Sequence, residues 1–222
     1  MRMRRKKHGA ERLAAMSHYL LEKPESPLTS PEAVFGHAGD MVLEVGCGKG
    51  GFACGMTEAH PDLCFFAMEK ISDVLVVATE QADARKEARK TDNLRFLLAD
   101  AKDLPLWFAP HSLSAVYLNF SDPWPKNKHA KRRLTYRAFL SLYFSLLKPG
   151  APLCFKTDNR PLFDFTLEEL AALGYTPDYV TYDLHTSPYN EGNIRTEYEE
   201  TFSAKGFTIN ALRVTAKDGE PR

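Results

Sequence analysis

Short apolar runs alternate with longer amphipathic segments along most of this chain. Five of the runs are apolar with β-branched or aromatic residues, which predicts buried strands at 41–45, 64–68, 94–98, 115–120 and 153–156. Four longer segments carry apolar residues at helical spacing, which predicts helices at 51–59, 72–89, 131–147 and 161–173. Two further runs predict final strands at 179–182 and 200–203.

This alternation predicts an α/β fold, a doubly wound and mostly parallel sheet with helices on both faces. The last two strands have no clear helix between them, so we expect a closing antiparallel hairpin. The first 30 residues differ, with a basic start, a short helix around 11–21 and a Pro/Ser-rich stretch at 24–31. The chain is therefore expected to divide into an N-terminal arm, 1–30, and an α/β domain, 31–222.

The formal net charge is zero, yet the cations gather in two places. Residues 1–12 hold six Lys or Arg against one acid, and residues 124–137 hold six with no acid. Such clusters on a neutral chain indicate a localised contact with a polyanion. A basic tail and a solvated helix face would give the same pattern, so charge alone leaves both interpretations open.

Composition limits where the protein works. No apolar stretch approaches the ~18 residues of a membrane span, and no apolar run follows the basic start as a signal peptide requires. We therefore expect a cytoplasmic protein without membrane contact. The four cysteines form no C-x-x-C pair, so we expect no metal site and buried thiols in a reducing compartment.

A glycine-rich turn follows the first predicted strand. Gly46, Gly48 and Gly51 match G-x-G-x-x-G, a spacing that allows a tight turn and a close backbone approach to a ligand. Dinucleotide sites use the same spacing, and a glycine-rich turn without a ligand is a further alternative. The motif alone does not separate these cases.

Acids at the ends of three successive strands favour S-adenosylmethionine. Glu44 precedes the glycines, where a carboxylate would repel the pyrophosphate of NAD but attract an ammonium or sulfonium group. Glu69 ends the second strand at the distance where an acid binds ribose hydroxyls. Asp100 follows the third strand and can accept from the adenine amino group. A solvated loop acid at Glu44 and a turn cap at Asp100 are the alternatives.

The segment after the fourth strand is the most informative one for the substrate. Its prolines stiffen the loop and can hold Asp122 facing the cofactor, while Trp124 offers a flat face for stacking a base. Lys126 and the basic run to residue 137 follow directly, which suits a nucleic acid. A rigid turn with a buried tryptophan is the alternative.

Two later segments have simple structural interpretations. Asp158 follows the fifth strand and fits the N-cap of the next helix. Thr196 and Glu199 have the spacing of a capping box.

Four segments, 43–52, 119–136, 155–158 and 196–202, together resemble the bacterial tRNA (guanine-N7-)-methyltransferase family. The run FSDPWPK at 120–126, continuing to KRRL at 131–134, is highly specific to that family, and the similarity spans nearly the whole chain. The resemblance implies a seven-stranded, Rossmann-like methyltransferase fold with S-adenosylmethionine as cofactor. It also implies a tRNA substrate methylated at a variable-loop guanine, conventionally position 46. Members of the family are monomers or homodimers.

The resemblance adds roles for individual residues. Asp122 matches the proposed catalytic position. With the glycines of the turn, the expected cofactor-binding residues are Glu44, Gly46, Gly48, Glu69, Asp100 and Asp122. The expected substrate-binding residues are Lys126, Asp158, Thr196, Glu197, Tyr198 and Glu199. Further RNA contacts are expected from the stacking and basic segment, at Trp124, Lys128, Lys131, Arg132 and Arg133.

The chemistry of this reaction is mainly positioning. N7 of guanine carries a lone pair and no proton, so it can attack a methyl group without a general base. Asp122 and Glu199 are candidates to accept from the guanine N1–H and N2–H donors, and a carboxylate stabilises the developing charge. Lys126, Arg132 and Arg133 would hold phosphates, and the target base is expected to be extruded.

Three other functions remain open on sequence grounds. A methyltransferase with another acceptor would keep the cofactor site but leave the basic run at 126–137 unexplained. A nicotinamide-dependent dehydrogenase is disfavoured by Glu44 and by the loop that carries Asp122. A non-catalytic RNA-binding protein on the same scaffold is disfavoured because every expected acidic position is filled.

Overall fold

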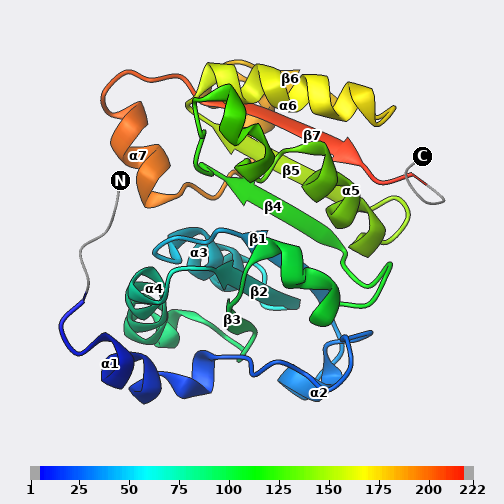
Figure 1. The fold of residues 1–222 in the computed structure, drawn as a ribbon. Helices are drawn as coiled ribbons and strands as arrows, with labels where there is room; N and C mark the ends of the chain where they lie inside the picture. The colour runs from blue at the N-terminus through cyan, green and yellow to red at the C-terminus, as the bar shows by residue number, and fades with distance from the viewer. Residues whose placement is uncertain (1–5, 218–222) are drawn as a thin grey trace. The chain divides into compact units, whose positions relative to one another are not determined.

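The computed structural model describes residues 6–217 and separates into two compact units, Met1–Ala109 and Pro110–Arg222 (Figure 1). We call them the N-terminal and C-terminal units and describe each by itself. Residues 1–5, which include three arginines of the expected arm, lie outside the described residues. The boundary expected after residue 30 stays a prediction.

Three parallel strands form the centre of the N-terminal unit. They are β1 (Asp40–Val45), β2 (Leu63–Glu69) and β3 (Leu94–Leu98), in the order β3-β2-β1. In register, Val45 lies beside Met68 and Glu69 beside Leu98, so the carboxyl ends of the three strands finish together. This edge carries the glycine turn and the acids singled out in the sequence.

Helices cover these strands. The helices α3 (Gly51–Ala59) and α4 (Ser72–Ala84) pack against each other and against the strands, and α1 (Gly9–Ala15) packs on α4. A short helix, α2 (Glu32–Phe35), precedes β1. Arg12 joins α1 to α4 through two hydrogen bonds from its guanidinium to Glu80, at 2.7 and 2.6 Å. Part of the basic arm is therefore docked on the α/β unit.

The C-terminal unit has four strands in the order β4-β5-β7-β6. The strands are β4 (Ala115–Asn119), β5 (Pro152–Thr157), β6 (Tyr179–Thr181) and β7 (Asn210–Thr215). The β4–β5 pair is parallel, and β7 runs antiparallel to both β5 and β6. The helices α5 (Arg137–Leu146) and α6 (Arg160–Ala172) pack together, and α6 lies on β5 and β7 (Figure 1).

The predicted strand at 200–203 is wrong, because those residues belong to the helix α7 (Glu197–Ser203). The capping box of Thr196 and Glu199 is formed and starts this helix, which outweighs the short apolar run. The last strand is β7, which the sequence interpretation missed. The closing antiparallel pair is confirmed as β6 and β7, but α7 lies between them in the chain.

Some helix boundaries also differ from the prediction. The helix expected at 131–147 begins only at Arg137, because 127–132 form a 3-10 turn and Tyr136 is extended. The helix expected at 72–89 ends at Ala84, and its N-cap is Ile71. The N-cap of α6 is Asn159 rather than Asp158, since the Asn159 side chain accepts from the N–H of Leu162.

Short 3-10 helices connect the longer elements. They are η1 (Ser17–Tyr19), η2 (Lys86–Ala88), η3 (Ala101–Leu106), η4 (Asn127–Arg132), η5 (Leu184–Thr186) and η6 (Pro188–Asn190). The helix expected around 11–21 is divided in this way, because α1 ends at Ala15 and η1 follows it.

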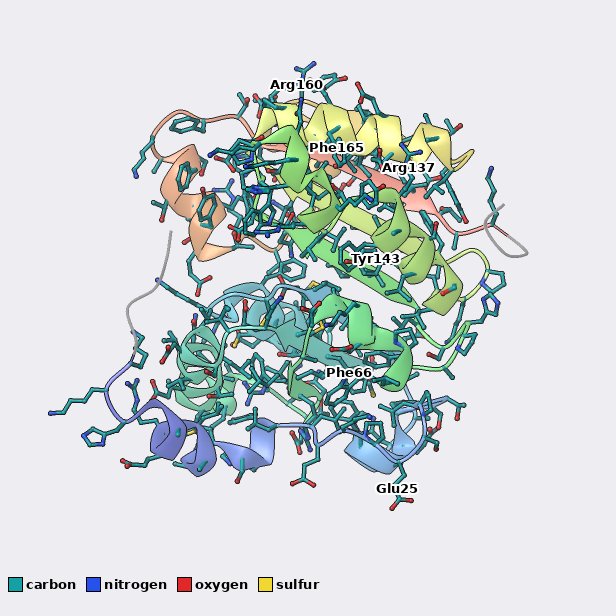
Figure 2. The ribbon with its side chains drawn as sticks, viewed as in Figure 1. Glu25, Phe66, Arg137, Tyr143, Arg160 and Phe165 are labelled. Atoms are coloured by element: carbon teal, nitrogen blue, oxygen red, sulfur yellow. The ribbon has the colours of Figure 1, made fainter. Side chains whose placement is uncertain are left out.

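Large side chains fill the interior of each unit. Phe66 of the N-terminal unit and Tyr143 of the C-terminal unit, both labelled in Figure 2, are fully buried. Burial of such rings contributes a large part of the hydrophobic stabilisation. Among residues 6–217, no helix combines the length and the apolar character that a membrane crossing needs.

Candidate active site

The glycine turn is tied to the end of β2. Gly46 has φ +81°, and the backbone N–H groups of Gly46 and Cys47 both donate to the carbonyl of Met68, at 2.8 and 2.9 Å. Gly48 also has positive φ, and a Cβ built there would meet no atom of the described part of the chain within 4 Å. The turn therefore leaves open space at Gly48, as a close backbone approach to a ligand requires.

Glu69 is held in place by backbone donors. Its carboxylate accepts from the N–H of Gly48 at 3.2 Å and from those of Lys70 and Ile71 at 2.8 and 2.9 Å. Three N–H donors fix the orientation of this acid at the mouth of the glycine turn. Such an arrangement suits a carboxylate that receives ribose hydroxyl groups.

Glu44 is buried within β1, with 1% of its surface exposed. The alternative of a solvated loop acid is therefore wrong. Burial, together with the charges of Glu44 and Glu69, raises the pKa of the Cys47 thiol well above its usual value. Cys47 thus lies in the negative field of both acids, and it stays neutral. A negative field at this turn suits a cationic ligand and disfavours a pyrophosphate.

Asp100 lies at the end of β3 and is partly engaged. Its carboxylate pairs with the Lys70 ammonium at 2.6 Å and caps η3 by accepting from the N–H of Lys102 at 3.2 Å. Burial opposes ionisation here, but Lys70 and the Lys102 N–H lower the Asp100 pKa overall. The cap expected as an alternative is present. The same carboxylate remains partly exposed and can receive an amino group.

Sequence interpretation missed the apolar part of this cluster. Ile71 and Leu98 are 49% and 45% exposed, although both are large and apolar. Each lies two residues from an acid of the cluster, Glu69 or Asp100. Exposed aliphatic side chains beside hydrogen-bonding acids give a flat ring both a surface and polar anchors. The sequence contained one indication of it, because an isoleucine follows two residues after the end of the second strand.

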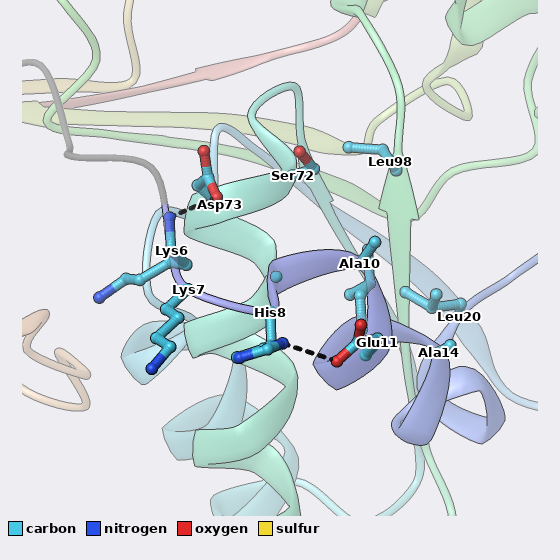
Figure 3. Close-up of a pocket in the computed structure, with 12 residues that line it drawn as sticks. Lys6, Lys7, His8, Ala10, Glu11, Ala14, Leu20, Ser72, Asp73 and Leu98 are labelled. Carbon is cyan, nitrogen blue, oxygen red and sulfur yellow. Dashed lines mark hydrogen bonds and ion pairs between the residues drawn. The ribbon is translucent and has the colours of Figure 1, made fainter.

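A groove lies between the basic arm and the same strand ends (Figure 3). Leu98 and Leu20 contribute apolar side chains, and Lys6 and Lys7 stand at the opposite side in Figure 3. The N–H of Lys6 donates to Asp73 in the first turn of α4 at 2.8 Å. The described part of the arm therefore begins against the first turn of α4.

In the C-terminal unit, the loop after β4 has an unusual backbone. Phe120 and Trp124 have φ of +51° and +40°, values that residues other than glycine rarely adopt. Asp122 stands exposed between them. The hydroxyl oxygen of Ser121 is buried and has no hydrogen-bond partner among residues 6–217. Strained backbone of this kind is concentrated at functional sites.

The basic segment divides into exposed and engaged cations. The exposed ones are Lys126, Lys128, Lys131 and Arg132. Arg132 lies 5.0 Å from the Trp124 ring centroid, and Arg133 donates to the carbonyls of Pro123 and Trp124. Arg137, labelled in Figure 2, makes two guanidinium hydrogen bonds to Glu169 of α6. Some cations of this segment therefore stabilise the fold through contacts within the protein and are not free to bind a partner.

Tyr198 at the start of α7 contacts other aromatic rings, and the charges of nearby acids act on it. Its ring lies 5.1 Å from that of Phe120, and it is 44% exposed. Burial raises the Tyr198 pKa, and the charges of Asp158 and Asp122 raise it further. Desolvation also raises the pKa of the Asp158 carboxyl. The ring contact therefore brings the start of α7 against the loop that carries Asp122. Asp122, Asp158 and Tyr198 were all expected at the substrate site.

Glu199 lies beneath this surface and is fully buried. One carboxylate oxygen accepts from Lys156 at 2.6 Å, and the other accepts from Asn193 at 2.8 Å and contacts His185 Nε2 at 2.8 Å. Burial alone would raise the Glu199 pKa, but Lys156, His185 and Asn193 lower it overall. Both oxygens of Glu199 are therefore engaged within the protein.

The remaining expected substrate residues lie close in sequence to this group. Thr196 is buried as the N-cap of α7, and Glu197 is partly exposed in its first turn. Lys126 lies at the exposed end of the loop after β4. Lys156 and His185 were missed by sequence interpretation, since no motif links them to Glu199.

A family model described as "Putative methyltransferase" matches residues 38–212 of the chain. Solved structures give the same fold. The structure of the 16S rRNA methyltransferase KamB is 17% identical, with a TM-score of 0.64, and covers 87% of this chain and 95% of its own. A variant of a 16S rRNA (adenine(1408)-N(1))-methyltransferase from Catenulisporales acidiphilia is 19% identical, with a TM-score of 0.57 and coverage of 98% and 96%.

A third structure was solved with the cofactor. Phosphoethanolamine N-methyltransferase 2 from Haemonchus contortus, in complex with S-adenosyl-L-methionine, is 14% identical with a TM-score of 0.51, and it covers 94% of this chain and 53% of its own. The predicted seven-stranded, mostly parallel, Rossmann-like methyltransferase fold is confirmed. The match to a methyltransferase family model, rather than the fold, argues against the dehydrogenase alternative. The chain belongs to the "Putative methyltransferase" family, and it is an S-adenosylmethionine-dependent methyltransferase.

Proposed function

We propose that this enzyme methylates N7 of the variable-loop guanine of tRNA, conventionally position 46. The observation that carries the proposal is the contact between the Phe120 and Tyr198 rings, which joins the loop of Asp122 to the start of α7. The half-exposed Tyr198 ring offers a purine a stacking surface, and the charges of Asp122 and Asp158, which act on this ring, offer hydrogen-bond acceptors in the same region. Among the bases, guanine presents the adjacent N1–H and N2–H donors that such acceptors select.

The acceptors we assign differ in part from the sequence expectation. Asp122 is exposed and Asp158 is half-buried, so both can receive guanine donors. Glu199 would have to give up Lys156, Asn193 or His185 to do so. We therefore assign Asp122 and Asp158 to the base and assign Glu199 to the support of α7.

The residues of the N-terminal unit fit the cofactor. We propose that Glu44 and the glycine turn face the ammonium of its amino-acid end. Glu69 would accept from the ribose hydroxyl groups, and Asp100 would accept from the adenine amino group. Ile71 would cover the adenine ring. When bound, the cofactor supplies an electrophilic methyl group. The protein has no proton to remove from N7, so its residues act by orienting the base and by stabilising its positive charge.

The exposed cations would supply RNA affinity. Lys126, Lys128, Lys131 and Arg132 lie on one short segment after the Asp122 loop. Phosphate contacts from such side chains position the RNA without reading its sequence. The family to which the chain belongs includes tRNA N7-guanine methyltransferases, which also supports a tRNA substrate.

The test is methyl transfer from labelled S-adenosylmethionine to an unmodified tRNA transcript. Two transcripts should be compared that differ only at position 46, one with guanosine and one with 7-deazaguanosine. The second lacks only the N7 lone pair and keeps the N1–H and N2–H donors. We expect labelling of the first transcript alone, with cleavage specific for 7-methylguanosine at that position.

Other outcomes separate the alternatives. Equal labelling of both transcripts would refute the N7 assignment and leave a tRNA methyltransferase. Labelling of ribosomal RNA but not of tRNA would refute the tRNA assignment. An Asp122→Asn variant that folds normally is expected to lose at least ~100-fold in kcat, because a charged acceptor is lost where positive charge develops.

A further inference from the structure

Two prolines leave the loop after β4 with few backbone hydrogen-bond donors of its own. Pro123 and Pro125 have no backbone N–H to donate. Trp124 has φ +40°, in the left-handed region that L-residues avoid, and a residue before proline is pushed toward extended conformations. This backbone needs contacts from elsewhere in the fold, and it carries Asp122.

Arg133 supplies those contacts. Its Nε donates to the carbonyl of Pro123 at 3.0 Å, and a terminal guanidinium nitrogen donates to the carbonyl of Trp124 at 3.1 Å. The guanidinium also lies 4.3 Å from the centroid of the Phe165 ring on α6, a residue labelled in Figure 2. One side chain thus joins two successive carbonyls of the loop to a helix of the unit.

The backbone of Arg133 is itself fixed. Its N–H donates to the carbonyl of Ala130, and its carbonyl accepts from the N–H of Tyr136, both at 3.0 Å. The guanidinium therefore extends from an anchored position onto a restrained loop. Through these hydrogen bonds, the loop that carries Asp122 is held in a fixed position relative to the rest of the unit.

We propose that Arg133 is a positioning residue that fixes loop 121–125, and through it Asp122, rather than a contact to an RNA phosphate. The proposal rests on the proposed function in assigning Asp122 to the guanine. It requires arginine in particular, because the planar guanidinium presents parallel N–H donors to two acceptors and a lysine ammonium does not. A phosphate contact, in contrast, depends mainly on charge.

Arg132 provides the matched comparison, since it is adjacent and exposed and carries the same chemistry. For Arg133→Lys we expect kcat to fall at least ~10-fold, with little change in the KM for tRNA, because the reacting groups lose alignment. For Arg132→Ala we expect a higher KM and a shallower dependence of tRNA binding on salt, as for one lost phosphate contact. Binding of S-adenosylhomocysteine should be equal in both variants.

A spectroscopic measurement tests the same proposal without catalysis. The chain has two tryptophans, so Trp107→Phe leaves Trp124 as the sole reporter of the loop. In that background, we expect Arg133→Lys to raise the acrylamide quenching constant of Trp124 by at least about twofold, because a freed loop admits the quencher. Phe165→Leu, which removes the platform of the guanidinium, should change quenching in the same direction if Arg133→Lys does not fold.

The outcomes are distinct. If Arg133→Lys keeps kcat and Trp124 quenching at wild-type values, the positioning role is refuted. If Arg133→Ala reproduces the KM and salt behaviour of Arg132→Ala, Arg133 is a phosphate contact and the proposal is likewise refuted. If the wild-type enzyme methylates no tRNA, the proposed function fails, while the quenching experiment still decides whether Arg133 fixes the loop.

Discussion

The ammonium of Lys156 lies 2.6 Å from a carboxylate oxygen of Glu199, and both side chains are almost excluded from solvent. Lys156 belongs to β5, and Glu199 is in the first turn of α7. The ammonium also donates to the Asn193 side chain and to the carbonyl of Ile194. The pair therefore joins the end of the sheet to the segment that carries Tyr198.

Removal of one partner should be costly. We expect Lys156→Met to destabilise the protein by about 3–5 kcal/mol, because it leaves the Glu199 carboxylate buried without its counter-ion. The double variant Lys156→Met/Glu199→Gln should recover part of this loss, since it removes the unpaired charge and keeps an acceptor for the capping box. Urea unfolding of the single and double variants measures both effects. A single variant as stable as the double variant would contradict the coupling.

The same pair predicts a dependence of stability on pH. The Glu199 pKa is lower in the folded state than the ordinary value of 4.5. Its contribution to stability is therefore present above pH 4.5 and is lost as the pH falls through the lowered pKa. We expect the stability difference between wild type and Glu199→Gln to be largest near neutral pH and to shrink as the pH falls below 4.5 and through the lowered pKa. A difference that stays constant from neutral to acidic pH would exclude this contribution.

The positions of the acids and glycines that were expected to bind the cofactor were largely predictable from the sequence, because local patterns determine them. A strand followed by glycines places Glu44 and Gly46 at a strand end. Parallel pairing in register brings Glu69 to the same edge. The Lys156–Glu199 pair was not predictable. Its partners are 43 residues apart in the sequence, and no sequence motif predicts that they pair.

The basic segment shows a different limit of sequence interpretation. Arg132 and Arg133 are neighbours with identical chemistry, and charge patterning assigned both to phosphates. In the structure one guanidinium faces the Trp124 ring and the other bonds backbone carbonyls. The two arginine side chains point in different directions because of the path of the backbone at 127–136. That segment was expected to be partly helical.

Gly50 was also missed, because it lies outside the G-x-G-x-x-G spacing. It has φ +84°, and a Cβ there would lie 3.0 Å from the Cβ of Ala78 on α4. We expect Gly50→Ala to cost about 2–4 kcal/mol, from the left-handed backbone and the clash together. Gly48→Ala is the matched control with open space, and it should cost only the backbone contribution of about 1–2 kcal/mol. Thermal unfolding compares them, and equal losses would contradict the close packing on α4.

Glu69 allows a direct test of the cofactor cluster. Glu69→Gln keeps an oxygen acceptor for the backbone N–H groups but removes the charge that we assign to the ribose hydroxyls. We expect the dissociation constant of S-adenosylhomocysteine to rise about 10-fold or more, because a hydrogen bond to a charged acceptor contributes about 1.5–3 kcal/mol. Isothermal titration calorimetry measures this change. Glu25→Gln is the control, since Glu25 is exposed in the same unit (Figure 2). Unchanged affinity in Glu69→Gln would mean that this acid only orders the turn between β1 and α3.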